Sequence, residues 1–319
     1  MTGIVVVSLL LTQCANFGGA GGGGRSARLQ ALGFEPVPLQ KITQDERFSG
    51  VFGINGVNMR LLIDSGANST DISQEFARQA SLRPDPNYAV VSRGALGRPV
   101  KSSLGTGSLQ IGSVVAEDFL FTIGPPVTRR TATSRYAGQM GLDAMVASST
   151  LVDVPRGRLW VPGDRRMTQS NGRPRPLGTQ AGLGKDIVRL YPAGRFPHLL
   201  VDTTVQGRKM TWVVDTGAEV SVMARAAFRN TGLPSVATSS RMIDAAGDRV
   251  TVRSATLYDV RVGRTRTGRF DLIVAPLDSV RSVFKDSNGR PVDGILGMDF
   301  LTQAQALLDP ASKLLYLGL

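Results

Sequence analysis

The stretch MRLLIDSGA at residues 59–67 returns at residues 210–218 as MTWVVDTGA, an offset of 151 positions. The same offset relates Gly56 to Gly207, so the register extends beyond the nine residues. In each copy a run of apolar and β-branched residues ends at an aspartate, and a hydroxyl residue, a glycine and an alanine follow it. This pattern predicts a buried strand that delivers a carboxylate onto a tight turn.

The similarity continues toward the end of each copy. Residues 138–143 (GQMGLD) correspond to residues 294–299 (GILGMD), and residues 151–161 correspond to residues 307–317. The offset is here 156 positions, which indicates a small insertion in the second copy. A repeat of this length predicts that one chain supplies two units of the same fold.

Each copy reads as short strands separated by turn residues. Val51–Ile54 and Leu199–Val205 run into a glycine turn and are followed by the strand that ends at the aspartate, which predicts a hairpin in each copy. Short helical patterns follow at Ser73–Ala80 and Met223–Asn230. We therefore predict an all-β fold of two closed lobes, related by a pseudo-twofold axis, with one short helix per lobe.

Composition shifts predict the domain boundaries. Residues 162–185 are rich in Gly, Pro, Arg and Gln without apolar periodicity, as in a linker. The predicted segments are a signal or lipoprotein signal peptide at 1–14, a Gly-rich tether and N-terminal segment at 15–46, an N-terminal lobe at 47–161, a linker at 162–196 and a C-terminal lobe at 197–319.

The composition limits the chemistry that the chain can perform. Hydrophobic residues make up 42% and charged residues 19%, enough for a sizeable core. One His and one Cys exclude a multi-His zinc site, a Cys-rich zinc module and an intrachain disulfide framework. Catalysis must then rest on carboxylates, hydroxyls, lysines or backbone groups, and we expect no metal and no organic cofactor.

The chain is basic, with a net charge of +12, which favours anionic surfaces or acidic partners. Its basic residues are mostly scattered arginines. The two densest stretches, 165–175 and 261–269, contain no aromatic residue on which a base could stack. Nucleic acid is therefore not an expected partner.

The N-terminus has the features of an export signal. The apolar run Ile4–Leu11 is too short to span a bilayer as a helix but suits a signal-peptide core. Leu11-Thr12-Gln13-Cys14 follows and resembles a bacterial lipobox, which makes Cys14 a lipidation candidate. The alternatives are an ordinary secretory signal or a misassigned start, with Cys14 incidental. We expect the bacterial periplasm or cell envelope, with membrane association through the N-terminus.

The two aspartates have the properties of a catalytic pair. A glycine after each hydroxyl residue lets two such loops approach backbone to backbone, where a Cβ would hold them apart. Two carboxyl groups at hydrogen-bonding distance cannot both ionise, so they share one proton. The ionised member can then activate a water while the protonated member polarises a carbonyl, as peptide hydrolysis requires.

At these residues the sequence resembles the retropepsin-like and pepsin-like aspartic proteases. The family signature is two apolar residues, Asp, Thr or Ser, Gly, and Ala or Ser, and each half closes with an apolar-apolar-Gly element. The closing elements are matched by residues 295–297 and, less well, by residues 139–141. The resemblance covers roughly residues 47–161 and 197–318 and implies a single-chain, two-lobed form that needs no dimer to complete its site.

The resemblance assigns roles to the repeated residues. It implies that Asp64 and Asp215 are catalytic. The supporting loop residues are Ser65 and Thr216, whose hydroxyls cross-brace the loops, Gly66 and Gly217, whose backbone contacts substrate, and Ala67 and Ala218.

Ala67 and Ala218 carry a further expectation. Pepsin-like members often have Ser at this position, which donates a hydrogen bond that favours the ionised carboxylate. Alanine cannot donate, so the pair should be less acidic. We expect an activity optimum at mildly acidic to neutral pH.

Family flaps are Gly-tipped hairpins that follow the catalytic loop. The matching stretches are Ser92–Val100, with Gly94 and Gly97, and Asp244–Val250, with Gly247. Flaps close over an extended peptide and exclude water. The alternative is that both stretches are ordinary surface hairpins.

Other polar residues are not expected to carry chemistry. His198 is the one histidine, and no Gly-x-Ser-x-Gly motif accompanies it, so a Ser-His-Asp mechanism is not expected. Asp143 and Asp299 follow the glycine elements and are expected to accept local hydrogen bonds. Asp153 and Asp309 are expected in strand-end turns.

These features together predict an aspartic endopeptidase of the bacterial cell envelope. Its substrates would be proteins or peptides, with membrane-anchored proteins as one class. The alternative is a non-catalytic protein that keeps the two-lobed groove and binds extended peptides or envelope polymers.

Overall fold

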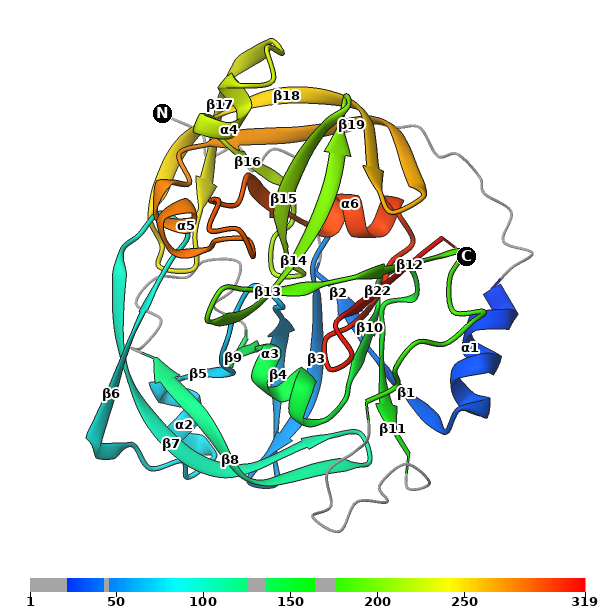
Figure 1. The fold of residues 1–319 in the computed structure, drawn as a ribbon. Coiled ribbons are helices and arrows are strands. Elements are labelled where there is room, and N and C mark those ends of the chain that lie inside the picture. The colour runs from blue at the N-terminus through cyan, green and yellow to red at the C-terminus, as the bar shows by residue number, and fades with distance from the viewer. Residues whose placement is uncertain (1–21, 43–45, 125–135, 164–175, 319) are drawn as a thin grey trace.

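Three β-sheets organise the chain. The computed structural model describes residues 22–42, 46–124, 136–163 and 176–318 (Figure 1). Two eight-stranded sheets form an N-terminal and a C-terminal lobe, and a six-stranded sheet joins them. The predicted all-β, two-lobed fold is confirmed.

The N-terminal lobe is one sheet that curls back on itself. Its strands are β2 (Gln40–Lys41), β3 (Phe48–Ile54), β4 (Val57–Ile63), β5 (Asp71–Ser73), β6 (Asp85–Arg93), β7 (Pro99–Ile111), β8 (Val114–Gly124) and β9 (Gly138–Met140). They lie in the order β2-β3-β4-β9-β5-β8-β7-β6, and an additional pairing joins β3 to β7.

The C-terminal lobe repeats this topology. Its strands are β13 (Tyr191–Ala193), β14 (Phe196–Val205), β15 (Arg208–Val214), β16 (Val222–Ala224), β17 (Ser235–Ile243), β18 (Arg249–Val262), β19 (Thr265–Ala275) and β20 (Gly294–Leu296). Their order is β13-β14-β15-β20-β16-β19-β18-β17, with an additional β14–β18 pairing. The sequence repeat therefore corresponds to a repeat of topology.

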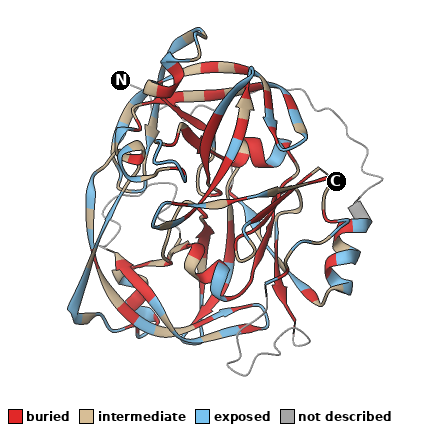
Figure 2. Ribbon diagram, viewed as in Figure 1, coloured by how far each residue is buried: buried red, intermediate tan, exposed pale blue. Residues whose placement is uncertain are grey.

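A tight hairpin brings the central strand of each lobe into place. Asn55 and Gly56 connect β3 to β4 with φ values of 48° and 80°, and Gln206 and Gly207 connect β14 to β15 with 47° and 81°. Two-residue turns with positive φ at both positions match the twist of the flanking strands. The hairpins predicted from the glycine turns are therefore present. Figure 2 shows that the central strands are mostly buried and the outer hairpins more exposed.

The joining sheet takes strands from the ends of both copies and from the N-terminus. Its strands are β1 (Phe34–Pro38), β10 (Leu151–Asp153), β11 (Arg158–Pro162), β12 (Asp186–Arg189), β21 (Leu307–Asp309) and β22 (Leu314–Leu317). They lie in the order β1-β11-β10-β21-β22-β12, so the equivalent strands β10 and β21 pair across the centre.

This sheet corrects one expectation. Residues 162–196 are not only a linker, because β12 pairs with β22 and β13 pairs with β14. These two strands have only four and three residues, too few for a local pattern to mark them. Asp153 and Asp309 are the last residues of β10 and β21, at strand ends as expected, and both are fully buried.

Short helices pack against the lobes. They are α2 (Gln74–Gln79) and α3 (Leu142–Ala147) in the first lobe, and α4 (Arg225–Arg229), α5 (Asp278–Val283) and α6 (Met298–Gln303) in the second. The expectation of one helix per lobe is therefore wrong. Helices of five or six residues are too short to show a 3.6-residue periodicity, although α2 and α4 were anticipated within a few residues.

The N-terminal segment also differs from the flexible tether that was expected. Residues Gly22–Ala31 form α1, which precedes β1 in the joining sheet. Arg25 and Leu29 are buried against the rest of the chain, so tertiary contacts offset the low helix propensity of the glycines. The signal segment and Cys14 lie outside the described residues. Within the described part, we find no helix long and apolar enough to cross a membrane.

Candidate active site

Asp64 and Asp215 each stand at the end of a central strand. Asp64 follows β4, and its backbone N–H donates to the Met140 carbonyl of the parallel strand β9 at 3.0 Å. Asp215 follows β15, and its N–H donates to the Leu296 carbonyl of β20, also at 3.0 Å. The parallel strand β9 or β20 therefore holds the backbone of each aspartate. These two strands lie in the closing elements that the sequence analysis identified.

The glycine two positions later orients each carboxylate. The Gly66 N–H donates to Asp64 Oδ1 at 2.9 Å, and the Gly217 N–H donates to Asp215 Oδ1 at 2.7 Å. Each glycine also touches the opposite aspartate. A Cβ on Gly66 would lie 2.4 Å from Asp215 Cγ, and one on Gly217 would lie 2.4 Å from Asp64 Cγ. Only glycine allows the two loops to come this close.

The hydroxyl residues brace the loops across the lobe boundary. The Ser65 N–H donates to Thr216 Oγ1 at 2.9 Å, and the Thr216 N–H donates to Ser65 Oγ at 3.0 Å. Each hydroxyl then donates to a strand of the other lobe, Ser65 to the Val214 carbonyl and Thr216 to the Ile63 carbonyl, both at 3.0 Å. Four buried hydrogen bonds therefore fix one loop against the other.

Ala67 and Ala218 close the two turns. The carbonyl of Ala67 accepts the Leu142 N–H at the start of α3, and that of Ala218 accepts the Met298 N–H at the start of α6, both at 2.9 Å. Their methyl side chains can donate no hydrogen bond to the carboxylates. These alanines therefore tie the catalytic loops to the helices behind them.

A hydroxyl–carboxylate pair supports each loop from behind. Thr70 Oγ1 donates to Asp143 Oδ1 at 2.7 Å, and Ser221 Oγ donates to Asp299 Oδ1 at 2.6 Å. Each hydroxyl also accepts the N–H of the glycine two positions before the aspartate, at 3.1 and 2.8 Å. Asp143 and Asp299 thus accept local hydrogen bonds, as expected. The sequence analysis missed Thr70 and Ser221, although the offset of 151 aligns them.

The two carboxyl groups hydrogen-bond to each other, and both residues are half-buried between the lobes. Burial and then the charge of Asp215 raise the pKa of Asp64 well above its ordinary value. Burial also raises the pKa of Asp215, but the Gly217 N–H and the positive charge of Arg47 oppose this rise. The negative charge of Asp71 also raises the pKa of Asp64. The pair therefore holds one proton, and the surroundings favour Asp64 as its carrier.

Comparison with known proteins agrees with this geometry in both lobes. Residues 201–300 match the sequence model of the family described as aspartyl protease. Residues 52–131 match that of the gag-polyprotein aspartyl protease. Each lobe therefore matches an aspartyl protease model, as the repeated motif predicts. No curated protein matches it in sequence.

Solved structures show the same fold at low identity. The aspartic proteinase from Irpex lacteus superposes with a TM-score of 0.54 at 14% identity, over 88% of this chain and 96% of that one. Basic 7S globulin from soybean gives a TM-score of 0.47 at 12% identity, over 88% and 94% of the two chains. The first likeness shows that this chain has the fold of that proteinase.

Two further residues contact the glycines of the aspartate loops across the lobes. The Arg47 guanidinium donates to the Gly217 carbonyl at 3.4 Å, and His198 Nε2 lies 2.9 Å from the Gly66 carbonyl, to which it donates. His198 packs on Phe284 with ring centroids 4.1 Å apart, and burial lowers its pKa to about 4. The neutral imidazole therefore holds a loop rather than exchanging protons. Sequence analysis missed Arg47, which the 151-residue offset aligns with His198.

The flap candidates are hairpins whose tips touch. The β6–β7 and β17–β18 hairpins meet beside α5 (Figure 1). The Leu96 N–H donates to Asp244 Oδ2 at 2.9 Å, and Arg98 lies 3.5 Å from the Asp248 carboxylate. The chain therefore has one such hairpin in each lobe, and their tips touch.

Glycines allow this contact between tips. A Cβ on Gly94 would lie 2.2 Å from Asp244 Oδ2, and one on Gly97 would lie 2.2 Å from Ser279 Oγ. Gly97 and Gly247 have φ values of 99° and 81°. The positive φ explains glycine at those two tips, and close packing explains Gly94.

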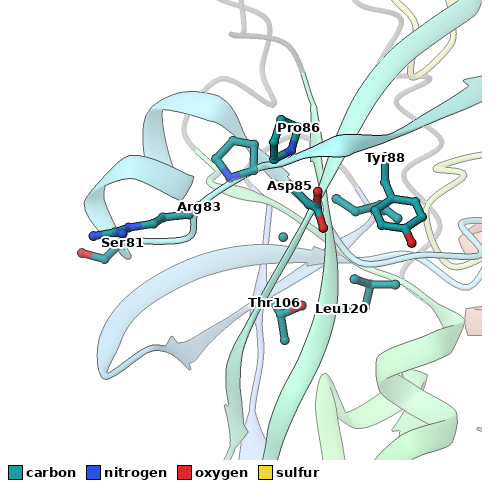
Figure 3. Close-up of a pocket in the computed structure, with 10 residues that line it drawn as sticks. Ser81, Arg83, Asp85, Pro86, Tyr88, Thr106 and Leu120 are labelled. Atoms are coloured by element: carbon teal, nitrogen blue, oxygen red, sulfur yellow. The ribbon is translucent and has the colours of Figure 1, made fainter.

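A separate hollow of about 770 Å³ lies on the outer side of the first lobe, at the base of the β6–β7 hairpin (Figure 3). Arg83, Asp85, Tyr88 and Leu120 contribute to its lining, and neither catalytic loop does. The hollow is therefore distinct from the site between the lobes. Across the described residues, no three His, Cys, Asp or Glu side chains are grouped as a metal site.

Proposed function

We propose that this chain is an aspartic endopeptidase of the bacterial cell envelope that cleaves protein substrates, including membrane-anchored ones. The observation that carries the catalytic part is the hydrogen-bonded, half-buried pair Asp64 and Asp215 at the boundary between two braced lobes. The apolar N-terminal run and the following cysteine support the envelope location.

In the first step, a water molecule between the carboxyls attacks the scissile carbonyl carbon. The ionised Asp215 accepts a proton from this water, while the protonated Asp64 donates its proton to the carbonyl oxygen. The product is a neutral tetrahedral diol. The positive charge of Arg47 near Asp215 and the negative charge of Asp71 near Asp64 favour this division of roles.

In the second step, the carbon–nitrogen bond breaks. Asp215 returns its proton to the leaving nitrogen, and Asp64 takes a proton back from one hydroxyl of the diol as the new carboxyl group forms. The pair ends with one shared proton, as it began. The reaction therefore requires no metal ion and no covalent intermediate on the protein.

The test compares the wild type with Asp64→Asn and Asp215→Asn on a casein-like substrate, with and without pepstatin. Because each replacement removes one half of the acid–base pair, we expect cleavage to fall by about 10³-fold or more. The control Glu117→Gln changes an exposed carboxylate on β8 and should leave the rate unchanged. Unchanged cleavage by Asp64→Asn would contradict the mechanism. Peptide binding without wild-type cleavage would instead indicate the non-catalytic alternative.

A second experiment tests the location. We expect the full chain, expressed in a bacterium, to fractionate with the envelope, and Cys14→Ser to release it from the membrane fraction if the cysteine is acylated. Release of the unchanged wild type as a free periplasmic protein would leave the ordinary secretory signal as the explanation. Retention of the wild type in the cytoplasm would contradict the proposed location.

A further inference from the structure

The strands next to Asp64 present one sheet face toward the catalytic pair. Successive side chains of a strand point to opposite faces, so Leu62 shares a face with Asp64, while Ile63 points into the core. Registered neighbours in a sheet share a face as well. The strand pairings add the following residues to this face: Gln139 beside Leu62, Asp71 beside Gln139, and Thr122 beside Asp71.

The equivalent face of the second lobe is entirely aliphatic. By the same pairings, the face that carries Asp215 consists of Val213, Ile295, Val222 and Ile273. The opposite faces do not differ in this way, because both are buried and apolar. They consist of Ile63, Met140, Ile72 and Ile123 in the first lobe, and Val214, Leu296, Met223 and Val274 in the second. The repeat has therefore kept its cores alike and changed only the faces beside the aspartates.

Asp71 and Gln139 form a defined polar pair on the first face. Gln139 Nε2 donates to Asp71 Oδ2 at 2.9 Å. Both side chains are partly exposed, whereas Val222 and Ile295 are buried. The charge of Asp71 acts on the Asp64 carboxyl, which places this pair close to the reacting groups. The pair is therefore partly exposed, and by the strand register it lies on the sheet face that carries Asp64.

We propose that Asp71 and Gln139 form a polar specificity pocket that takes a lysine or arginine side chain on one side of the scissile bond, while the aliphatic face of the second lobe takes an apolar side chain on the other. This inference rests on the proposed endopeptidase function and adds its substrate class. The enzyme then cleaves between residues of unlike polarity.

The chemistry of the pair selects a cationic donor. In the described part of the chain, Gln139 is the only side chain that donates to the Asp71 carboxylate, so the carboxylate can accept more hydrogen bonds. The Gln139 side-chain carbonyl is a second acceptor. Lysine and arginine offer several donors and a compensating charge, whereas an apolar side chain would leave a partly buried carboxylate without a partner.

The preference depends on pH in a definite direction. Burial, and then the charge of Asp143, raise the pKa of Asp71 to about 7, and the Gln139 hydrogen bond acts against this rise. Asp64 is the other carboxyl that faces Asp71. The pocket is therefore anionic above neutral pH and neutral below it, where it can still accept hydrogen bonds. Selectivity for lysine over an uncharged donor such as glutamine should rise from pH 5 to pH 8.

A peptide library with varied residues on both sides of the cleaved bond tests the proposal. We expect the wild type to favour basic over aliphatic residues at one position by about 10- to 100-fold in kcat/KM. The double variant Asp71→Val, Gln139→Ile installs the residues of the second lobe and should lose this preference. The matched variant Val222→Asp, Ile295→Gln should create a preference for basic residues on the other side of the cleaved bond as well. An unchanged profile in the first double variant would overturn the proposal.

Two further measurements separate failure of the pocket from failure of catalysis. Asp71→Asn keeps the size of the side chain and an acceptor for Gln139 but removes the charge, so it should weaken the lysine preference even if the double variant does not fold. Binding of the same peptides to Asp64→Asn measures selection without hydrolysis. Preference for basic peptides in this binding assay, with no wild-type cleavage, would reject the enzyme and keep the pocket. Cleavage without any preference for basic residues would keep the enzyme and reject the pocket.

Discussion

Asp64 and Asp215 occupy equivalent positions in the repeat, yet their surroundings differ. Asp215 receives the positive charge of Arg47, and Asp64 receives the negative charge of Asp71 when Asp71 is ionised, at about neutral pH and above. Both effects favour the shared proton on Asp64. The two halves of the catalytic pair therefore differ because residues outside the repeated motif differ, while the loop geometry itself is symmetric.

This pair should set the pH dependence of cleavage. Burial raises the pKa of both carboxyls. The methyl side chains of Ala67 and Ala218 donate nothing to them, although the Ala218 backbone N–H acts to lower the pKa of Asp215. The singly protonated pair is present between its two apparent pKa values, and both lie above the ordinary Asp value of about 3.9. We expect a bell-shaped kcat/KM profile with its maximum at mildly acidic to neutral pH. A maximum well below that ordinary value would contradict this reasoning.

The Thr216 hydroxyl should contribute measurably to the stability of the fold. It accepts from the Ser65 N–H and donates to the Ile63 carbonyl, and the residue is 1% exposed. Thr216→Val would leave both backbone groups buried without this partner, and we expect a loss of about 2–4 kcal/mol in the free energy of unfolding. Thr216→Ser copies the first lobe and should lose much less. Equal stability of the two variants in urea denaturation would contradict the role of the hydroxyl.

Among the elements, the two flap hairpins are joined mainly by one carboxylate. Asp244 Oδ2 accepts the Leu96 N–H of the other flap, and its Oδ1 accepts the Asp248 N–H of its own turn, both at 2.9 Å. The Arg98–Asp248 ion pair is much more exposed, with 60% and 35% of the two side chains accessible. Exposed ion pairs of this kind contribute little. The contact between the two flap candidates therefore depends mainly on the Asp244 carboxylate, which also caps its own turn.

Asp244→Ala should open the flaps more often. Without the carboxylate acceptor, amide hydrogens at residues 94–98 should exchange several-fold faster, while exchange in β4 and β15 stays unchanged. Arg98→Ala serves as the control and should alter exchange little. Equal protection of the first tip in the wild type and in Asp244→Ala would show that this hydrogen bond does not hold the flaps together.

In the whole molecule, the six-stranded sheet and α1 hold the lobes in register. Arg25 of α1 is buried and contacts residues of both copies of the repeat and of the segment between them. It donates to the Leu183, Gln305 and Gly318 carbonyls and to the Asp153 carboxylate. Its contacts join the N-terminal helix to the segments that precede and end the second lobe. Arg25 therefore ties α1 to both copies of the repeat at a distance from the two aspartates.

Arg25→Ala should destabilise the entire fold. It leaves the buried Asp153 with one ion-pair partner fewer and removes the donor from three carbonyls, so we expect a loss of about 3–5 kcal/mol. Arg28→Ala changes an exposed residue of the same helix and should alter stability by no more than about 0.5 kcal/mol. Chemical denaturation measures both. A small change in the free energy of unfolding of Arg25→Ala would mean that α1 contributes little to the stability of the fold.

Several errors of the sequence analysis share one physical origin. The helices α3 and α6 have six residues each, too few to show periodicity, and β10 and β21 have three each. Such elements are stable because of partners far away in the chain. Thr70, Ser221 and Arg47 were missed for a related reason, because their roles lie in contacts with other loops. The repeat offset does align Thr70 with Ser221 and Arg47 with His198, so a comparison of the two copies could have identified these residues as candidates.

The duplication, the strand endings at Asp64 and Asp215, and the glycine turns were readable in the chain because each depends on a few neighbouring residues. Only the tertiary structure determines the other features: the contact between the two carboxyls, the six-stranded sheet, the contact between the flap candidates and the unlike faces beside the aspartates. These features join residues that lie about 150 positions apart or more, or depend on how short strands pair. The free energy of such contacts comes from packing and hydrogen bonding across space, which no local pattern of residues records.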